Sequence, residues 1–175
     1  DSYKKFLTAA GNWLSPPSHL SDVLLLEEQA YIHIGYSYIA LEEYGSGIGY
    51  FRDVLTKFPR SQSIPEILYQ LGVLYERTGS EQQAIDAFRM LANDAPASEY
   101  ADDALFRLGN AYYHDEKYQQ AIDAYTRLVE TYPQSPNWQR AQLMMGNCYF
   151  TLEQQEQALV HYEQAFQQKA SIVRI

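Results

Sequence analysis

The feature that most constrains this chain is a repeat of 37 residues that runs through most of its 175 positions. Glycine recurs at this interval, and a tyrosine, a small residue, a second aromatic residue and a proline follow each glycine at fixed distances. The series are Gly35, Gly72, Gly109 and Gly146; Tyr38, Tyr75, Tyr112 and Tyr149; Gly47, Ala84, Ala121 and Ala158; Phe51, Phe88, Tyr125 and Tyr162; and Pro59, Pro96 and Pro133. A fixed period of this length is the signature of a helical solenoid, in which each unit contacts its neighbours.

One repeat, Ala104–Pro133, shows what each unit contains. Apolar residues recur at helical spacing in its first half and again in its second half, while His114–Lys117 between them is polar. Proline closes the unit because it cannot continue a helix. We therefore expect two amphipathic helices per unit. The glycine and the small residue should lie where the helices of one pair approach closely, and the aromatic residues should fill the space between successive pairs.

The register predicts an all-α, right-handed solenoid of four helix pairs plus an N-terminal helix. The predicted helices are 22–41, 46–57, 63–78, 81–93, 98–115, 118–131, 137–152 and 156–169. The predicted segments are an N-terminal helix and loop over 1–21, repeats over 22–59, 60–96, 97–133 and 134–170, and a tail over 171–175. Ser15-Pro16-Pro17 should end the N-terminal helix, which is either a cap on the first pair or the remnant of a preceding repeat. The loop should extend over 15–21.

Two local patterns add detail. Ser63-Ile64-Pro65-Glu66 and Ser80-Glu81-Gln82-Gln83 have the spacing of capping boxes, in which side chains bind free amides at a helix start. The segment Gly45-Ser46-Gly47-Ile48-Gly49 has the composition of a phosphate-binding loop but lacks the preceding strand that such a loop needs. We expect its two additional glycines to loosen the second helix of the first pair by roughly 1 kcal/mol each relative to alanine.

The order of these residues resembles the tetratricopeptide repeat over about residues 22–169. The usual period of that family is 34 residues, so we expect the three additional residues to lengthen the start of each first helix. The linkers Pro59-Arg60-Ser61, Pro96-Ala97-Ser98 and Pro133-Gln134-Ser135 look like those of bacterial cell-envelope proteins. Examples are the BamD-like lipoprotein of outer-membrane barrel assembly and the periplasmic partner of the Tol–Pal system. The resemblance favours a periplasmic or envelope-associated location, although a cytoplasmic one stays possible.

Composition excludes several classes of function. The net charge of −9 makes nucleic acid an unsuitable partner, and no apolar run approaches the roughly 18 residues of a membrane span. The single cysteine, Cys148, cannot form an internal disulfide and is expected in the core. Because the chain begins at Asp1, we expect either a removed leader or a piece of a longer protein.

We find no motif that predicts catalysis, a cofactor or a metal site. The four histidines have no Cys, Asp or Glu partners at ligand spacing, and no nucleophile motif of the Gly-x-Ser-x-Gly kind occurs. The pairs Glu27-Glu28 and Glu42-Glu43 are adjacent, so their carboxylates diverge on a helix. The sequence predicts that the chain is not an enzyme and carries no cofactor.

A protein-binding groove is the remaining prediction. In the tetratricopeptide geometry, the first helix of each pair lines the inner face, with residues three before, one after and four after each glycine pointing inward. The predicted groove comprises Ile32, Tyr36, Ile39, Tyr69, Val73, Glu76, Arg77, Phe106, Asn110, Tyr113, His114, Arg140, Asn147 and Phe150. Aromatic residues with a few charges are typical of peptide-binding surfaces.

We therefore interpret the chain as a non-catalytic scaffold that binds a peptide or helix of a protein partner, in a bacterial envelope assembly. One alternative is self-association into a homo-oligomer, with solenoids stacking through Phe6, Trp13 and Ile172–Ile175. Another is a regulatory domain of a larger catalytic or membrane protein.

Overall fold

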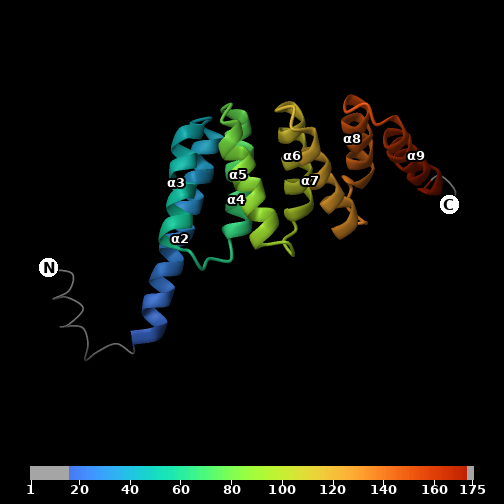
Figure 1. The fold of residues 1–175 in the computed structure, drawn as a ribbon. Coiled ribbons are helices and arrows are strands. Elements are labelled where there is room, and N and C mark those ends of the chain that lie inside the picture. The colour runs from blue at the N-terminus through green and yellow to red at the C-terminus, as the bar shows by residue number, and fades with distance from the viewer. Residues whose placement is uncertain (1–15, 173–175) are drawn as a thin grey trace. The chain divides into compact units, whose positions relative to one another are not determined.

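A computed structural model describes the backbone of residues 16–172 and the side chains of residues 23–166. This part of the chain contains eight helices and no strand (Figure 1). They are α2 (Pro16–Ala40), α3 (Tyr44–Lys57), α4 (Ile64–Arg77), α5 (Glu81–Asp94), α6 (Ala101–His114), α7 (Tyr118–Thr131), α8 (Trp138–Thr151) and α9 (Gln155–Ile172). The prediction of an all-α solenoid is confirmed. The predicted N-terminal helix, with Phe6 and Trp13, lies outside the described residues.

The chain divides into two compact units, one ending at Ser61 and the other starting at Gln62. Unit 1 contains the pair α2 and α3. Unit 2 contains α4 to α9, and each of these helices packs against the next one along the chain. Figure 1 shows these six helices side by side in chain order. Short connections make consecutive helices antiparallel, so three pairs stack within unit 2.

An aromatic ring on a glycine joins the two helices of every pair. A Cβ atom added to Gly72 would lie 2.3 Å from Cε1 of Phe88, and one added to Gly109 would lie 2.3 Å from Cε1 of Tyr125. Gly35 and Gly146 would meet the rings of Phe51 and Tyr162 at 2.5 Å. Glycine is thus required because the ring occupies the space of a side chain. The predicted close approach is correct, but the ring fills space within its own pair rather than between successive pairs.

Leucines and alanines complete the core around these rings. In unit 2, Phe88, Leu91, Tyr125 and Leu128 are fully buried on the second helices, and Leu105 is 1% exposed on α6. Cys148 is also fully buried, as predicted. Burial raises the pKa of its thiol to about 11, so the thiol stays protonated near neutral pH.

The turn inside each pair places one residue in the left-handed backbone region. These residues also recur every 37 positions: Glu42 (φ 61°), Gly79 (φ 71°), Glu116 (φ 56°) and Glu153 (φ 58°). The next amide donates to the carbonyl of the repeat tyrosine, as from Lys117 to Tyr112 at 2.9 Å. This is the bond that closes a Schellman motif. Only the second repeat has the glycine that this conformation favours.

The prediction that the three additional residues lengthen each first helix is wrong. Each helix from α3 to α8 has 14 residues, and the additional residues form the linkers 95–100 and 132–137. The amide of Ser98 donates to the carbonyl of Ala95 at 3.0 Å, and the hydroxyl of Ser98 accepts from the amide of Tyr100 at 3.2 Å. Ser135 repeats both bonds. Proline and serine therefore hold a turn where a longer helix was expected.

The start of the first helix is also different from the prediction. Residues 16–21 belong to α2 rather than to a loop, and α2 has 25 residues. The prediction takes Pro16 and Pro17 as the end of a preceding helix, whereas in the structure they lie in the first turn of α2. Proline lacks an amide hydrogen that the first turn does not need, and its fixed φ suits a helix start.

The predicted capping boxes are not formed. Neither Ser63 nor Ser80 makes a side-chain capping bond to its helix. Ser63 has helical backbone angles itself, with φ −81° and ψ −6°, whereas a capping residue is usually extended. The Ser80 hydroxyl lies 3.3 Å from that of Thr78.

The two kinds of glycine in unit 1 give the first prediction. Gly35→Ala should lower the free energy of unfolding by about 1–3 kcal/mol, because its Cβ would overlap the Phe51 ring. The matched control is Gly49→Ala in α3, where nothing lies within 4 Å of an added Cβ. That change should raise stability by up to about 1 kcal/mol. Thermal unfolding followed by circular dichroism measures both, and equal effects of the two changes would contradict the packing explanation.

Candidate functional site

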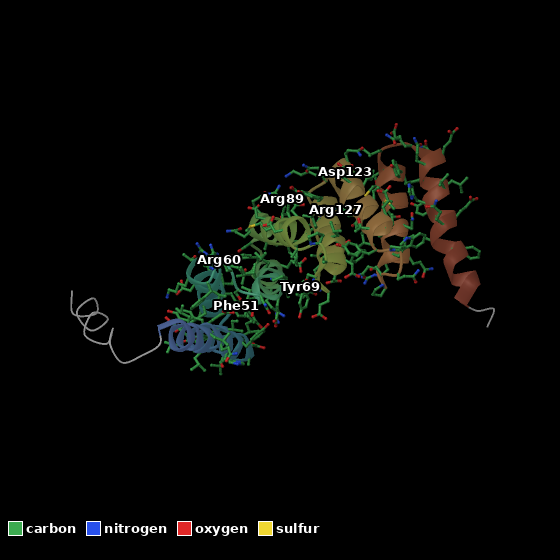
Figure 2. The ribbon with its side chains drawn as sticks, turned by 90° about the horizontal axis from the view of Figure 1, so that it is seen from below. Phe51, Arg60, Tyr69, Arg89, Asp123 and Arg127 are labelled. Carbon is green, nitrogen blue, oxygen red and sulfur yellow. The ribbon has the colours of Figure 1, made fainter. Side chains whose placement is uncertain are left out.

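The predicted groove residues of unit 2 lie along α4, α6 and α8, the first helices of its three pairs. We call this surface the first-helix face and define it by Tyr69, Val73, Glu76, Asp103, Phe106, Arg107, Asn110, Tyr113, Arg140, Leu143, Asn147 and Phe150. Figure 2 shows Tyr69 on one side of unit 2 and Arg89, Asp123 and Arg127 of the second helices on the other. The first-helix face has two parts, a polar cluster and an exposed apolar end.

Asp103 on α6 is the centre of the polar cluster. Its carboxylate accepts bonds from the Tyr69 hydroxyl at 2.6 Å, from Nε of Arg107 at 2.7 Å and from Nδ2 of Asn137 at 3.0 Å. Arg107 also pairs with Glu76 at 2.7 Å. One carboxylate thus connects α4, α6 and the residue that precedes α8.

These contacts shift the pKa values of two acids in opposite directions. Burial alone would raise the pKa of Asp103, but the bonds from Tyr69, Arg107 and Asn137 outweigh it and hold this pKa below its ordinary value. Burial raises the pKa of Glu76, and its pairing with Arg107 offsets only part of that rise. Asp103 is therefore the firmly ionised member of the cluster.

Phe106, a predicted groove residue, lies below the surface. It is only 5% exposed, and the guanidinium of Arg140 lies 4.4 Å from its ring centroid. Arg140 also donates to Asn137 at 3.2 Å. Phe106 packs under Arg140, so an arginine rather than an aromatic ring meets the solvent here.

The two predicted groove asparagines bind their own pair. Asn110 accepts a bond from the Tyr125 hydroxyl at 2.7 Å, and Asn147 accepts one from the Tyr162 hydroxyl at 2.9 Å. Both partners are the repeat aromatics that cover a glycine. In the second repeat the aromatic is Phe88, and the position of the asparagine holds Val73. In the third and fourth repeats the aromatic with a hydroxyl thus bonds to an amide of its own pair.

The apolar end of the face is on α8. Phe150 is 63% exposed and Leu143 is 48% exposed. Tyr113 of α6 is half-buried, with its ring centroid 5.5 Å from that of Tyr118. Among the predicted residues at helix ends, Arg77 and His114 are exposed. The ring centroids of His114 and Tyr113 lie 5.9 Å apart.

Two of the three predicted residues of unit 1, Tyr36 and Ile39, pack within their own pair. The Tyr36 ring meets the Phe51 ring edge-on at 5.2 Å, and a Cβ on Gly47 would lie 3.2 Å from Ile39. Ile32 is half-buried. These contacts give Tyr36 and Ile39 structural roles in α2 and α3.

Two hollows of unit 2 lie away from the first-helix face and were missed in the sequence. One, of about 280 Å³, has Leu105, Leu108 and Tyr112 among its apolar lining and Arg127 at its side. Arg127 donates to the carbonyl of Ala92 and to Asn93, so it joins α7 to α5. The other, of about 480 Å³, lies at the linker 95–100.

The second hollow occurs where a repeated bond is lost. Ser61 donates to Glu28 and Ser135 donates to Asp102, each at 2.5 Å. Pro65 occupies the repeat position of Glu28 and Asp102. Ser98 therefore has no carboxylate at that position to accept its bond. Only a comparison of linker and helix positions across repeats could have found this difference.

Within residues 16–172 we find neither a cluster of metal ligands nor a membrane-spanning helix. No group of three or more His, Cys, Asp or Glu side chains there could hold a metal ion. None of the helices within the same part of the chain is long and apolar enough to cross a membrane.

Stacked helix pairs with a ring on a glycine in each pair define a solenoid of the tetratricopeptide class, and the tetratricopeptide family model matches residues 34–99. A second model, that of the YfiO outer membrane lipoprotein family, matches residues 68–175. The chain therefore belongs to the YfiO outer membrane lipoprotein family. The resemblance stated from the sequence is confirmed. None of the curated proteins matches the chain significantly.

Solved structures show the same fold. A crystal structure of MamA is 20% identical over 99% of this chain and 88% of its own, with a TM-score of 0.69. A tetratricopeptide repeat protein from Parabacteroides merdae is 18% identical over 78% of this chain and 51% of its own, with a TM-score of 0.68. MamA from Desulfovibrio magneticus RS-1 is 19% identical over 82% of this chain and 76% of its own, with a TM-score of 0.65. These similarities show the fold, and the two family models make the chain a non-catalytic protein-interaction scaffold.

The hydrogen bond between Tyr125 and Asn110 gives a prediction on stability. Tyr125→Phe and Asn110→Val should each lower the free energy of unfolding by about 1 kcal/mol, because each leaves a polar group without its partner. The double variant restores the Phe–Val combination of the second repeat and should recover most of the loss. A double-mutant cycle from urea unfolding measures the coupling, and additive losses would contradict the pairing.

The Asp103 cluster gives a prediction on pH. Asp103→Asn should cost about 2 kcal/mol near neutral pH, because it removes hydrogen bonds to a charged group. The folded pKa of Asp103 is lowered, so this stabilisation is present above the ordinary pKa and is lost as pH falls through the folded value. The difference between wild type and variant should therefore shrink below about pH 4.

The control for this experiment is Asp86→Asn. Asp86 pairs with Arg89 on the surface of α5, where both side chains are about half exposed. Such a pair contributes little, so stability should change by less than about 1 kcal/mol. Urea unfolding at several pH values measures both variants, and a constant penalty for Asp103→Asn at every pH would contradict the assignment.

Proposed function

We propose that this scaffold binds an amphipathic segment of a partner protein on the first-helix face of unit 2. The segment is an extended strand or a helix with large apolar side chains on one side. The proposal places the contact at the α8 end of the face, on Leu143 and Phe150, with Tyr113 beside them. It places the assembly in the bacterial cell envelope.

The exposure of Leu143 and Phe150 is the observation that carries the proposal. Leu143 occupies the repeat position of Phe106, which is 5% exposed, whereas Leu143 is 48% exposed and Phe150 63% exposed. The two residues are seven positions apart on one helix, so they lie on the same side of α8. Large apolar groups that meet solvent on one stripe are typical of an interaction site.

The polar cluster supports one orientation of the partner. Asp103, Arg107 and Glu76 already pair with one another, so a partner gains little by replacing those bonds. Arg140, which covers Phe106, lies three residues before Leu143 on α8. A partner with an acidic group at one end of its apolar stripe could meet Arg140 while its apolar residues cover Leu143 and Phe150.

Family membership supports the envelope location. The matched family is described as outer membrane lipoproteins, and the linkers with Pro-x-Ser resemble those of envelope proteins. The net charge of −9 agrees with a protein rather than an anionic lipid or nucleic acid as the partner.

Site-specific crosslinking tests the proposal. A photo-reactive benzoylphenylalanine in place of Phe150 should form a crosslinked product with an envelope protein in cells. The same group in place of Met90, which is 48% exposed on α5, is the matched control and should not. A product at position 90 alone, or no product at either position, would contradict the proposed face.

A second variant measures the energetic contribution. Leu143→Ala with Phe150→Ala should weaken binding of the crosslinked partner roughly tenfold or more, since exposed anchors of this kind dominate interface energies. Both side chains are exposed, so the thermal unfolding temperature should stay close to that of wild type. Unchanged affinity, measured by calorimetry with the purified partner, would contradict the role of these residues.

A further inference from the structure

The helix α9 is the last one that the structure describes, and one of its faces has no neighbour among the described residues. Leu159 on α9 is 58% exposed, while the equivalent residues of α5 and α7, Ile85 and Ile122, are each 3% exposed. Phe166 is 75% exposed, while at its repeat position Ala92 of α5 is fully buried and Val129 of α7 is half-buried. Both α5 and α7 pack against the helix pair that follows them. On α9 the same positions meet solvent.

The first helix of unit 1 shows the complementary feature. Ala30 is exposed, and Ile34 is 38% exposed. The equivalent residues of α6 and α8 are covered: Ala104 and Ala141 are fully buried, Leu108 is 6% exposed and Met145 is 1% exposed. These are first-helix positions that the preceding pair covers within the stack.

Exposed apolar residues extend this second face toward the start of α2. Leu26 is 66% exposed and Val23 is 59% exposed. Leu26, Ala30 and Ile34 are spaced by four residues, so they form one stripe along the helix. We call this stripe the head face and the Leu159–Phe166 stripe of α9 the tail face.

The two helices that carry these faces are both longer than the other helices. The helices from α3 to α8 have 14 residues each, whereas α2 has 25 and α9 has 18. Register places the additional residues of α2 at its amino end and those of α9 at its carboxyl end. Because successive helices are antiparallel, the amino end of one lies beside the carboxyl end of the one before. Both extensions would therefore lie at the same edge of an α9–α2 contact.

We propose that the tail face of one copy binds the head face of a second copy, which continues the stack of helix pairs from chain to chain. The contact uses the same repeat positions that join α5 to α6 and α7 to α8 within one chain. It is a head-to-tail contact, so each added copy leaves one face of each kind free and longer assemblies can form. The residues of this contact are on α2 and α9 rather than on the first-helix face, but a following copy would lie beside Leu143, so the two proposed contacts compete there.

The negative charge of the chain opposes this association. Each copy carries a net charge of −9, and Glu27 of α2 and Glu163 of α9 are exposed beside the two faces. Like charges repel, so salt that screens them should strengthen the contact. Burial of the apolar stripes supplies the attraction.

Two blocked variants test the proposal by sedimentation. The tail-blocked variant is Leu159→Glu with Phe166→Glu, and the head-blocked variant is Leu26→Glu with Ala30→Glu. All four side chains are exposed, so circular dichroism should match wild type. Wild type should show an average mass that rises with concentration above the 20.2 kDa of one chain, and more so in higher salt. Each variant alone should stay at one chain.

An equal mixture of the two variants gives the decisive result. Each retains the face that the other lacks, so the mixture should form a complex of two chains and nothing larger. Met90→Glu, an exposed apolar change on α5, is the control and should associate as wild type does. A single-chain mass for wild type at every concentration would overturn the proposal. Association by the head-blocked variant alone would also overturn it, because that result indicates a tail-to-tail contact.

Discussion

The contact of an aromatic ring with a glycine determines how the rest of this structure is built. In each pair the ring of the second helix lies where a side chain of the first helix would be. This contact fixes both the distance between the two helices and their register. Because consecutive glycines are 37 residues apart, each pair repeats the same geometry. A chain whose pairs are alike in this way can only stack them, and the solenoid follows.

The same contact decides which residues can serve binding. A tyrosine ring buried on a glycine needs a partner for its hydroxyl, and Asn110 and Asn147 supply it. Two polar residues of the first-helix face are therefore used within the pair. The Asp103 cluster uses further polar groups to join α4, α6 and the start of α8. We therefore place the proposed partner contact at the α8 end, where Leu143 and Phe150 are exposed.

The sequence was sufficient to predict the helix pairs, because glycine, the small residue and the aromatic ring all interact within one repeat. It was not sufficient to place the three additional residues. Their position depends on bonds such as that from Ser98 to Ala95, whose turn competes with a longer helix. The proline pair at Pro16 was misread for a similar reason, since proline can precede or follow a helix end.

The repeat register also could not predict which side chains are buried. Phe106 and Leu143 share one repeat position, yet the first is 5% and the second 48% exposed. The difference arises because Arg140 of the next pair covers Phe106. For Leu143 that covering arginine would have to come from a pair beyond α9. Residues of α8 and α9, the last pair that the structure describes, therefore differ in exposure from their equivalents even where the sequence repeats. The same reasoning applies to α9, whose exposed apolar stripe is the surface on which we propose that another first helix packs.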